Sequence, residues 1–224
     1  IVDDMVVDVA ALGEALGDPL PDTMLGLIDA GKPGLNALQA CLDEVDGDFP
    51  IHTATALANV RLLAPIPRPR ENIFGIGLNY LDHVLESAKA LDTNDALPKQ
   101  PVIFSKPPTA VIGPDDPILH NSKITKQLDW AVELAVIIGT RATRVSLDRA
   151  LNHVFGYSVM IDVSARDNRR AGQWIVSKGM DSYAPFGPVI VTADEIPDPQ
   201  SLDLWLTVNG VEKQRSNTAK MLFK

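Results

Sequence analysis

Short runs rich in apolar and β-branched residues, broken by glycine and proline, dominate the chain after residue 70. Residues of this kind favour extended structure, and the runs have the length of single strands. The predicted strands are 73–77, 101–104, 133–138, 154–161, 188–192 and 202–208. Only two helices, over 80–91 and 146–154, are predicted between them. So many strands with so few crossover helices predict a β-rich α+β fold and argue against a doubly wound sheet.

The first part of the chain has a helical pattern instead. Apolar residues recur at helical spacing in 8–16, in 21–30 and again in 36–44, and Gly31 and Pro33 are expected to end the second of these helices. A proline-rich stretch, 64–70, then favours an extended backbone. We therefore expect a small acidic N-terminal domain and linker over 1–66, and a second domain over 67–224.

The charge of the chain is unevenly distributed. The net charge of its 224 residues is −9 at pH 7, and residues 1–60 contain eleven acidic residues against the single basic residue Lys32. The remainder is close to neutral and has no basic cluster. Such a chain is a poor candidate for binding phosphate backbones, so nucleic acid is not an expected partner.

The cysteine content and the apolar runs indicate a cytoplasmic protein. Cys41 is the sole cysteine, so no intrachain disulfide can form, which fits a reducing compartment. The longest apolar runs fall far short of the roughly 20 residues that span a bilayer. The acidic N-terminus does not resemble a signal peptide. We therefore expect no membrane partner.

His83 and Glu86 form the first candidate cluster. Three residues apart on a helix, they share a face, so the carboxylate can orient the imidazole and raise its basicity. Such a pair can activate water. An incidental pair on a surface helix is the alternative.

Asp129, Ala131 and Glu133 form the second cluster, on what is predicted to be one strand. Alternation places the three on one face. Glu133 precedes an apolar run, where a carboxylate is costly to bury without a partner, and a cation would satisfy it. The alternative is an ion pair with Arg141 or Arg144.

Asp162 and Lys178 complete the candidates. Asp162 ends an apolar strand, and carboxylates from separate strands suit a hard ion such as Mg²⁺, Mn²⁺ or Ca²⁺. A helix N-cap is the competing role for Asp162. Lys178 lies between Trp174 and an apolar segment, so its ammonium would hold a carboxylate or enolate if partly desolvated, or would be an ordinary solvated lysine.

In this order, these clusters resemble the fumarylacetoacetate hydrolase family, in its bacterial type with a small N-terminal domain. Each motif is weak alone, but six in the same order argue against a chance match. The matching segments are GLNYLDHVLE (77–86), FSKP (104–107), LDWAVELAVIIG (128–139), GYSVMIDVSARD (156–167), KGMDSYAPFGP (178–188), and Asn209-Gly210 with Gln214, Asn217 and Thr218.

The resemblance implies a mixed β-sandwich roll, a homodimer, and a divalent cation, Mg²⁺ or Mn²⁺ with Ca²⁺ possible, held by three carboxylates. The ligand positions match 131, Glu133 and Asp162. His83 and Glu86 match the pair that positions the catalytic water, and Lys178 matches the lysine near the substrate oxyanion. Substrate-binding positions match Tyr80, Arg166 and Lys178.

The activity implied is hydrolysis of a carbon–carbon bond in a 2,4-dioxo acid of the acylpyruvate type, through a metal-held pyruvate enolate. An oxaloacetate-type decarboxylase, an isomerase, a hydratase or a non-catalytic member of the family are alternatives that share the same site.

Two features depart from the family pattern. Ala131 stands where the family has a glutamate, which removes one anionic ligand. It is either an engineered knockout of that ligand or a natural loss that leaves a weakened or inactive site. The sequence also ends at Lys224, before a further block of strands and a substrate loop that family members carry. The second domain is therefore expected to be truncated at its C-terminus.

Overall fold

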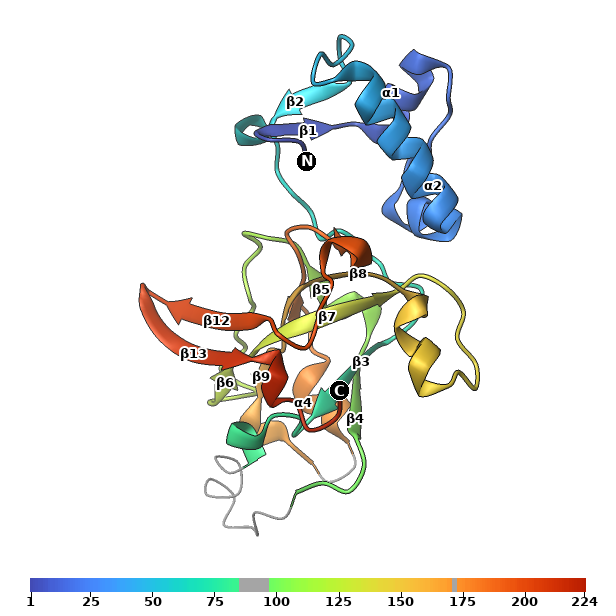
Figure 1. Ribbon diagram of the computed structural model, residues 1–224. Helices are drawn as coiled ribbons and strands as arrows, with labels where there is room; N and C mark the ends of the chain where they lie inside the picture. Colours follow the sequence, from blue (N-terminus) through green and yellow to red (C-terminus); the bar gives the residue numbers. More distant parts are fainter. Residues whose placement is uncertain (85–96, 171–172) are drawn as a thin grey trace. The chain divides into compact units, whose positions relative to one another are not determined.

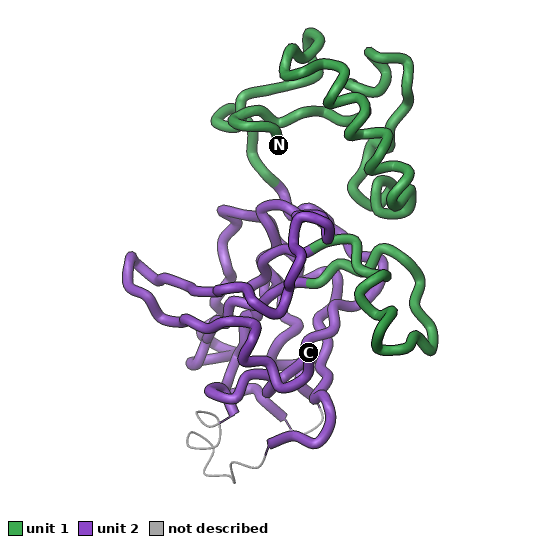
Figure 2. Tube along the Cα trace, viewed as in Figure 1, with its two compact units in different colours: residues 1–62, 136–156 green, residues 63–135, 157–224 purple. Residues whose placement is uncertain are grey.

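The computed structural model describes residues 1–84, 97–170 and 173–224. The chain divides into two compact units, one formed by 1–62 and 136–156 and the other by 63–135 and 157–224 (Figure 2). Its mixture of helices and sheets confirms the predicted α+β class. The domain boundary near residue 66 stays a prediction. No helix in the described part of the chain is both long enough and apolar enough to cross a membrane.

The N-terminal segment combines one small sheet with two helices (Figure 1). Strands β1 (Met5–Val7) and β2 (Ala54–Ala56) pair antiparallel, and helices α1 (Val9–Leu16) and α2 (Met24–Val45) connect them. The side chain of Asp8 accepts a hydrogen bond from the Ala11 amide at 3.0 Å, which caps α1. These elements match the helical pattern predicted for this part of the chain.

Helix α2 is broken at Gly31, whose backbone adopts φ 57° and ψ −146°. A positive φ of this kind costs glycine little because it has no Cβ. The sequence predicted an end to the helix at Gly31 and Pro33 and a new helix from residue 36. The structure has a kink instead of a loop, because helical geometry resumes at once and continues to Val45.

The other elements are mostly short strands in several small sheets (Figure 1). Three pairs are antiparallel: β3 (Ile73–Gly77) with β4 (Val102–Lys106), β6 (Leu128–Asp129) with β9 (Ser164–Ala165), and β12 (Asp203–Val208) with β13 (Val211–Asn217). Strands β5 (Val111–Ile112) and β10 (Ala184–Pro185) are parallel, and β7 (Val132–Ile138), β8 (Val154–Ile161) and β11 (Val191–Thr192) form a sheet in the order β11-β8-β7. The short helix α4 spans Trp174–Lys178.

Turns of 3-10 helix complete the described elements. They span Leu57–Asn59, Pro108–Ala110, Leu147–His153, Arg166–Asn168, Ala193–Glu195 and Thr218–Lys220. The prediction of a helix over 146–154 is therefore corrected to a 3-10 helix. The helix predicted over 80–91 is present at 81–84, Tyr80 forms an isolated β-bridge with Met221 instead, and 85–91 lie outside the described residues.

The strand predicted to carry the second candidate cluster is two strands in the structure. β6 ends at Asp129 and β7 begins at Val132, so the expectation of one continuous alternating face was wrong. Between them the Ala131 carbonyl accepts a hydrogen bond from the Asp162 amide at 2.8 Å. That bond places the chain near residue 131 beside the end of β8, and both segments contribute to the site.

A small core lies next to these strands. Val163, Ala165 and Tyr183 are almost completely buried, and the partly buried side chains packed against them are Leu128, Ile161 and Met180. Burial of such side chains stabilises the fold by about 25 cal/mol for each Å² of apolar surface removed from water. The core therefore fixes the loop after β8, which carries Asp162.

Candidate functional site

One pocket in the unit formed by 63–135 and 157–224 gathers the predicted site residues. Its lining includes Tyr80, His83, Ala131, Glu133, Asp162, Arg166 and Lys178. Glu86, the predicted partner of His83, lies outside the described residues. The roles assigned to these side chains stay predictions, but the pocket brings the side chains together.

Asp162 is the buried centre of the site. Its side chain is only 9% exposed, and it forms ion pairs with Lys106 through Oδ1 and with Lys178 through Oδ2. Because its carboxylate faces two ammonium groups, Asp162 does not act as a helix N-cap, the competing role considered from the sequence. An anion in this environment is stabilised by charge as well as by hydrogen bonds.

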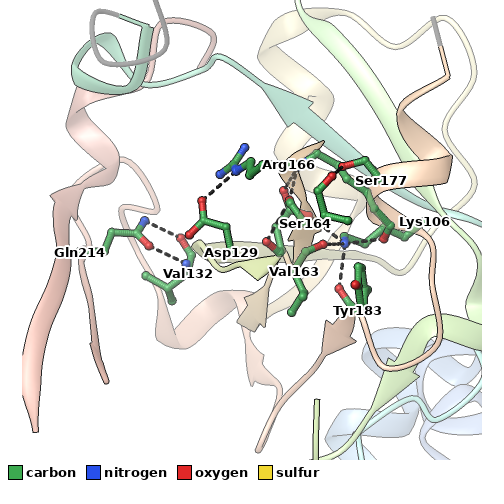
Figure 3. Close-up of polar contacts among 12 residues, drawn as sticks. Lys106, Asp129, Val132, Val163, Ser164, Arg166, Ser177, Tyr183 and Gln214 are labelled. Carbon is green, nitrogen blue, oxygen red and sulfur yellow. Dashed lines mark hydrogen bonds and ion pairs between the residues drawn. The ribbon is translucent and has the colours of Figure 1, made fainter. Parts of the chain in front are cut away.

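Lys106 is a site residue that sequence reasoning missed (Figure 3). Its Nζ donates hydrogen bonds to the carbonyls of Val163 at 2.9 Å, Lys178 at 2.7 Å and Tyr183 at 2.8 Å. Burial lowers the pKa of Lys106 to about 8, although the nearby Asp162 opposes that shift. One signal was available, because strand alternation places Lys106 on the same inward face of β4 as Phe104.

Lys178 is the last residue of helix α4, and its side chain is buried. Its Nζ donates to Asp162 Oδ2 and to Ser164 Oγ at 3.0 Å, and it lies 4.4 Å from the centroid of the Phe104 ring. The structure therefore has the desolvated lysine, not the solvated one that sequence reasoning left open. An ammonium held in this way is ready to face a developing negative charge.

Glu133 lies close enough to Asp162 for the two carboxylates to repel each other. Burial and the charge of Asp162 together raise the pKa of Glu133 to about 8, against the opposing effect of Lys178 and Lys106. The alternative partners Arg141 and Arg144 are not among the groups that influence it. A buried and a partly buried carboxylate with such mutual repulsion are the kind of pair that a divalent cation neutralises.

Two further contacts fix the frame of the site (Figure 3). Arg166 Nε donates to Asp129 Oδ2 at 2.8 Å, which joins the segment after β9 to β6. Gln214, on β13, accepts from the Val132 amide at 2.7 Å and donates to the Val132 carbonyl at 3.1 Å. Val132 lies between Ala131 and Glu133, so this amide holds the backbone at the predicted ligand positions.

The donor set fits a hard divalent cation only in part. Glu133 and Asp162 supply carboxylate oxygens, and the buried Asp162 Oδ1 lies 2.8 Å from Lys106 Nζ. Ala131, at the predicted third position, has no oxygen to offer from its side chain. Within the described residues, no group of three or more His, Cys, Asp or Glu side chains is arranged to hold a metal.

A comparison with protein families decides where the chain belongs. Residues 72–224 match the family described as fumarylacetoacetate (FAA) hydrolase C-terminal. The chain belongs to the fumarylacetoacetate hydrolase family. This confirms the resemblance seen in the sequence motifs, and the named members similar to this chain include tautomerases, a hydrolase and isomerases.

Curated family members are more than a third identical to the chain over the aligned residues. The mitochondrial oxaloacetate tautomerase fahd2 of Xenopus laevis is 39% identical over 211 residues, which cover 92% of this chain and 62% of that protein. The oxaloacetate tautomerase YisK of Bacillus subtilis is 40% identical over 169 residues, which cover 75% of this chain and 55% of that protein. The chain thus spans about 62% of the length of the first of these relatives.

Solved structures of family members share the fold. A putative HpcE protein from Mycobacterium smegmatis superposes with a TM-score of 0.77 at 31% identity, covering all of this chain and 73% of that one. Maleylpyruvate hydrolase from Sphingobium sp. SYK-6, in complex with manganese(II) ion and pyruvate, gives a TM-score of 0.75 at 29% identity, covering 99% and 74%. These similarities confirm the predicted fold class and indicate that a divalent metal is used within the family.

Proposed function

We propose that the chain carries the site of a divalent-metal-dependent enzyme that acts on a 2-oxo acid through its enolate. The observation that carries the proposal is the buried group of Asp162 and Lys178 beside Glu133 in one pocket. The reaction we favour is hydrolysis of a carbon–carbon bond in a 2,4-dioxo acid. A homodimer and a cytoplasmic location remain predictions.

Glu133 and Asp162 would hold the cation, which we propose to be Mg²⁺ or Mn²⁺. When bound, a divalent cation supplies Lewis-acid stabilisation of the negative charge on an enolate. Lys178 contributes a second positive charge at the same end of the pocket, because its Nζ is already desolvated and fixed by Asp162. Arg166 and Tyr80 line the pocket and would bind the carboxylate of the substrate.

His83 has the role of base in the favoured reaction. It lines the pocket and would take a proton from water as the water oxygen attacks the distal carbonyl carbon. The bond between that carbon and its neighbour then breaks, its electron pair passes into the enolate, and a proton returned to the enolate carbon gives the 2-oxo acid product. The new carboxylic acid departs with the oxygen of water.

Tautomerisation of oxaloacetate is the second candidate, and the names of the curated relatives support it. Interconversion of keto and enol forms requires only proton transfer at carbon and oxygen, so no water is consumed. The two candidates share the enolate and differ in the step assigned to His83. Loss of the ligand at Ala131 leaves a third possibility, a family member that binds its ligand without turnover.

Calorimetric titration of Mg²⁺ and Mn²⁺, with and without oxalate as a mimic of the pyruvate enolate, tests the proposal. The chain is compared with Ala131→Glu, and Ala131→Gln serves as a matched control of similar size without charge. We expect Ala131→Glu to bind metal at least tenfold more tightly than either other form, with oxalate strengthening the binding. If none of the three binds metal, the assignment of Glu133 and Asp162 is wrong.

A further inference from the structure

The pocket has a cationic and aromatic wall that the proposed reaction does not use. Arg169 and Trp174 line the same pocket as Asp162 and Lys178. The Arg169 guanidinium carbon lies 4.2 Å from the centroid of the Trp174 ring. A guanidinium stacked on an aromatic face keeps its N–H groups directed outward in its own plane, where they can bind a planar anion through two hydrogen bonds.

Arg169 differs from its neighbour Arg166 in how its charge is balanced. Arg166 forms an ion pair with Asp129 at 2.8 Å. Among the residues that the structure describes, no carboxylate is within ion-pair distance of Arg169. Asp167, two residues away, instead accepts hydrogen bonds from the Thr125 hydroxyl and the Lys126 amide. Arg169 is thus a partly buried cation without an anionic partner in the described chain.

The electrostatic setting of Arg169 favours an external anion. Burial lowers the pKa of its guanidinium, and the positive charge of Arg166 lowers it further. Both effects disfavour the charged form relative to water, and a bound carboxylate would offset both. The carboxylates of Glu133 and Asp162 are assigned to the proposed cation, and the positive charges next to them are those of Lys178 and Lys106.

We propose that Arg169 binds a second carboxylate of the substrate, so that the site selects 2-oxo dicarboxylic acids over 2-oxo monocarboxylic acids of the same chain length. The inference rests on the proposed function, because Lys178 and the cation site hold the 2-oxo end. The carbon chain then passes along Phe104 and Trp174, whose ring centroids are 5.9 Å apart. Arg169 is a specificity-determining residue and takes no part in bond breaking.

The test measures binding by calorimetry in the presence of Mg²⁺, in the chain and in its Ala131→Glu form. The ligands are two matched pairs, oxaloacetate with 2-oxobutanoate and 2-oxoglutarate with 2-oxopentanoate, together with oxalate. The variants are Arg169→Gln, which removes the charge, and Arg169→Lys, which keeps it. Arg170→Gln is the control, because Arg170 is exposed and next in the sequence.

At least one dicarboxylate is expected to bind about tenfold or more tightly than its monocarboxylate partner, as for a hydrogen-bonded charge. Arg169→Gln should abolish that preference and leave binding of oxalate and the monocarboxylates unchanged, which also shows that the variant is folded. Arg169→Lys should keep part of the preference and Arg170→Gln all of it.

Three results would overturn the inference, and they differ in what else they overturn. If oxalate binds but neither pair shows a dicarboxylate preference, or if the preference survives in Arg169→Gln, only the role of Arg169 is wrong. If neither form of the chain binds oxalate or any 2-oxo acid, the proposed function fails and the role of Arg169 fails with it.

Discussion

Lys106 Nζ lies 2.8 Å from Asp162 Oδ1, yet its hydrogen bonds go to three backbone carbonyls. An ammonium group has three protons, each of which can be donated to one of these carbonyls, so the contact with Asp162 is chiefly one of charge. Lys106 therefore joins the buried carboxylate of Asp162 to the backbone at Val163, Lys178 and Tyr183.

Replacing Lys106 with methionine should destabilise the chain by about 3 kcal/mol, because it removes three buried hydrogen bonds to backbone carbonyls and one of the two ion pairs of Asp162. Urea unfolding measures the loss. The matched control is Lys220→Met, which removes the exposed ion pair with Asp82 and should cost less than about 1 kcal/mol. An equal loss of unfolding free energy in the two variants would show that the buried contacts of Lys106 stabilise the chain no more than an exposed ion pair does.

Replacing His83 with alanine in the Ala131→Glu form should reduce hydrolysis of a 2,4-dioxo acid by about a hundredfold or more. Metal affinity should hardly change, because His83 is assigned to water and not to the cation. Turnover assays and calorimetry on the same samples separate the two effects. A large fall in metal affinity would remove His83 from the role of base.

Asp167 makes the stability of the folded chain depend on pH in the acid range. Hydrogen bonds from the Lys126 amide and the Thr125 hydroxyl hold the pKa of Asp167 below its usual value. A lowered folded pKa means stability that is present above the unfolded pKa and is lost as the pH falls through the folded one. Asp167→Asn should therefore be less stable than the unchanged chain at about pH 7, with the difference shrinking towards about pH 3.

Urea unfolding at a series of pH values checks this prediction. Asp148→Asn is a suitable control, since Asp148 is an exposed acid in a 3-10 helix. A stability difference between Asp167→Asn and the unchanged chain that stays constant across the acid range would exclude the ionisation of Asp167 as its cause.

Gln214→Leu should destabilise the chain by about 1–3 kcal/mol, because both the N–H and the carbonyl of Val132 lose their partner. Gln214→Glu keeps an acceptor for the amide and should cost less. Urea unfolding ranks the three forms. Leucine and glutamate variants of equal stability would contradict the paired hydrogen bonds.

The sequence predicted local features well where neighbouring residues determine them. The predicted strand over 73–77 coincides with β3, and that over 154–161 with β8, because β-branched residues there are bounded by turn-forming ones. The prediction of one continuous strand failed at 128–133, where a hydrogen bond from the distant Asp162 amide interrupts the strand. A tertiary contact of that kind leaves no periodic signal.

The candidate site divides in the same way. Side chains whose chemistry is visible in a motif, such as Glu133, Asp162 and Lys178, were named from the sequence and line one pocket. Lys106 falls within the matched segment FSKP, but the sequence does not reveal its role, because its partners come from three separate segments. Arg169 lay next to a matched segment without any pattern of its own, and only its stacking on Trp174 draws attention to it.

The paired hydrogen bonds of Gln214 give the β12–β13 hairpin a remote influence on the pocket. Gln214 is 82 residues from Val132 in the sequence, and the turn at Asn209-Gly210 closes the hairpin that carries it. A peptide sensor inserted at that turn would pull on the backbone between Ala131 and Glu133 when it bends the hairpin. The hairpin is therefore a natural attachment point for engineering a metal site whose affinity responds to an outside signal.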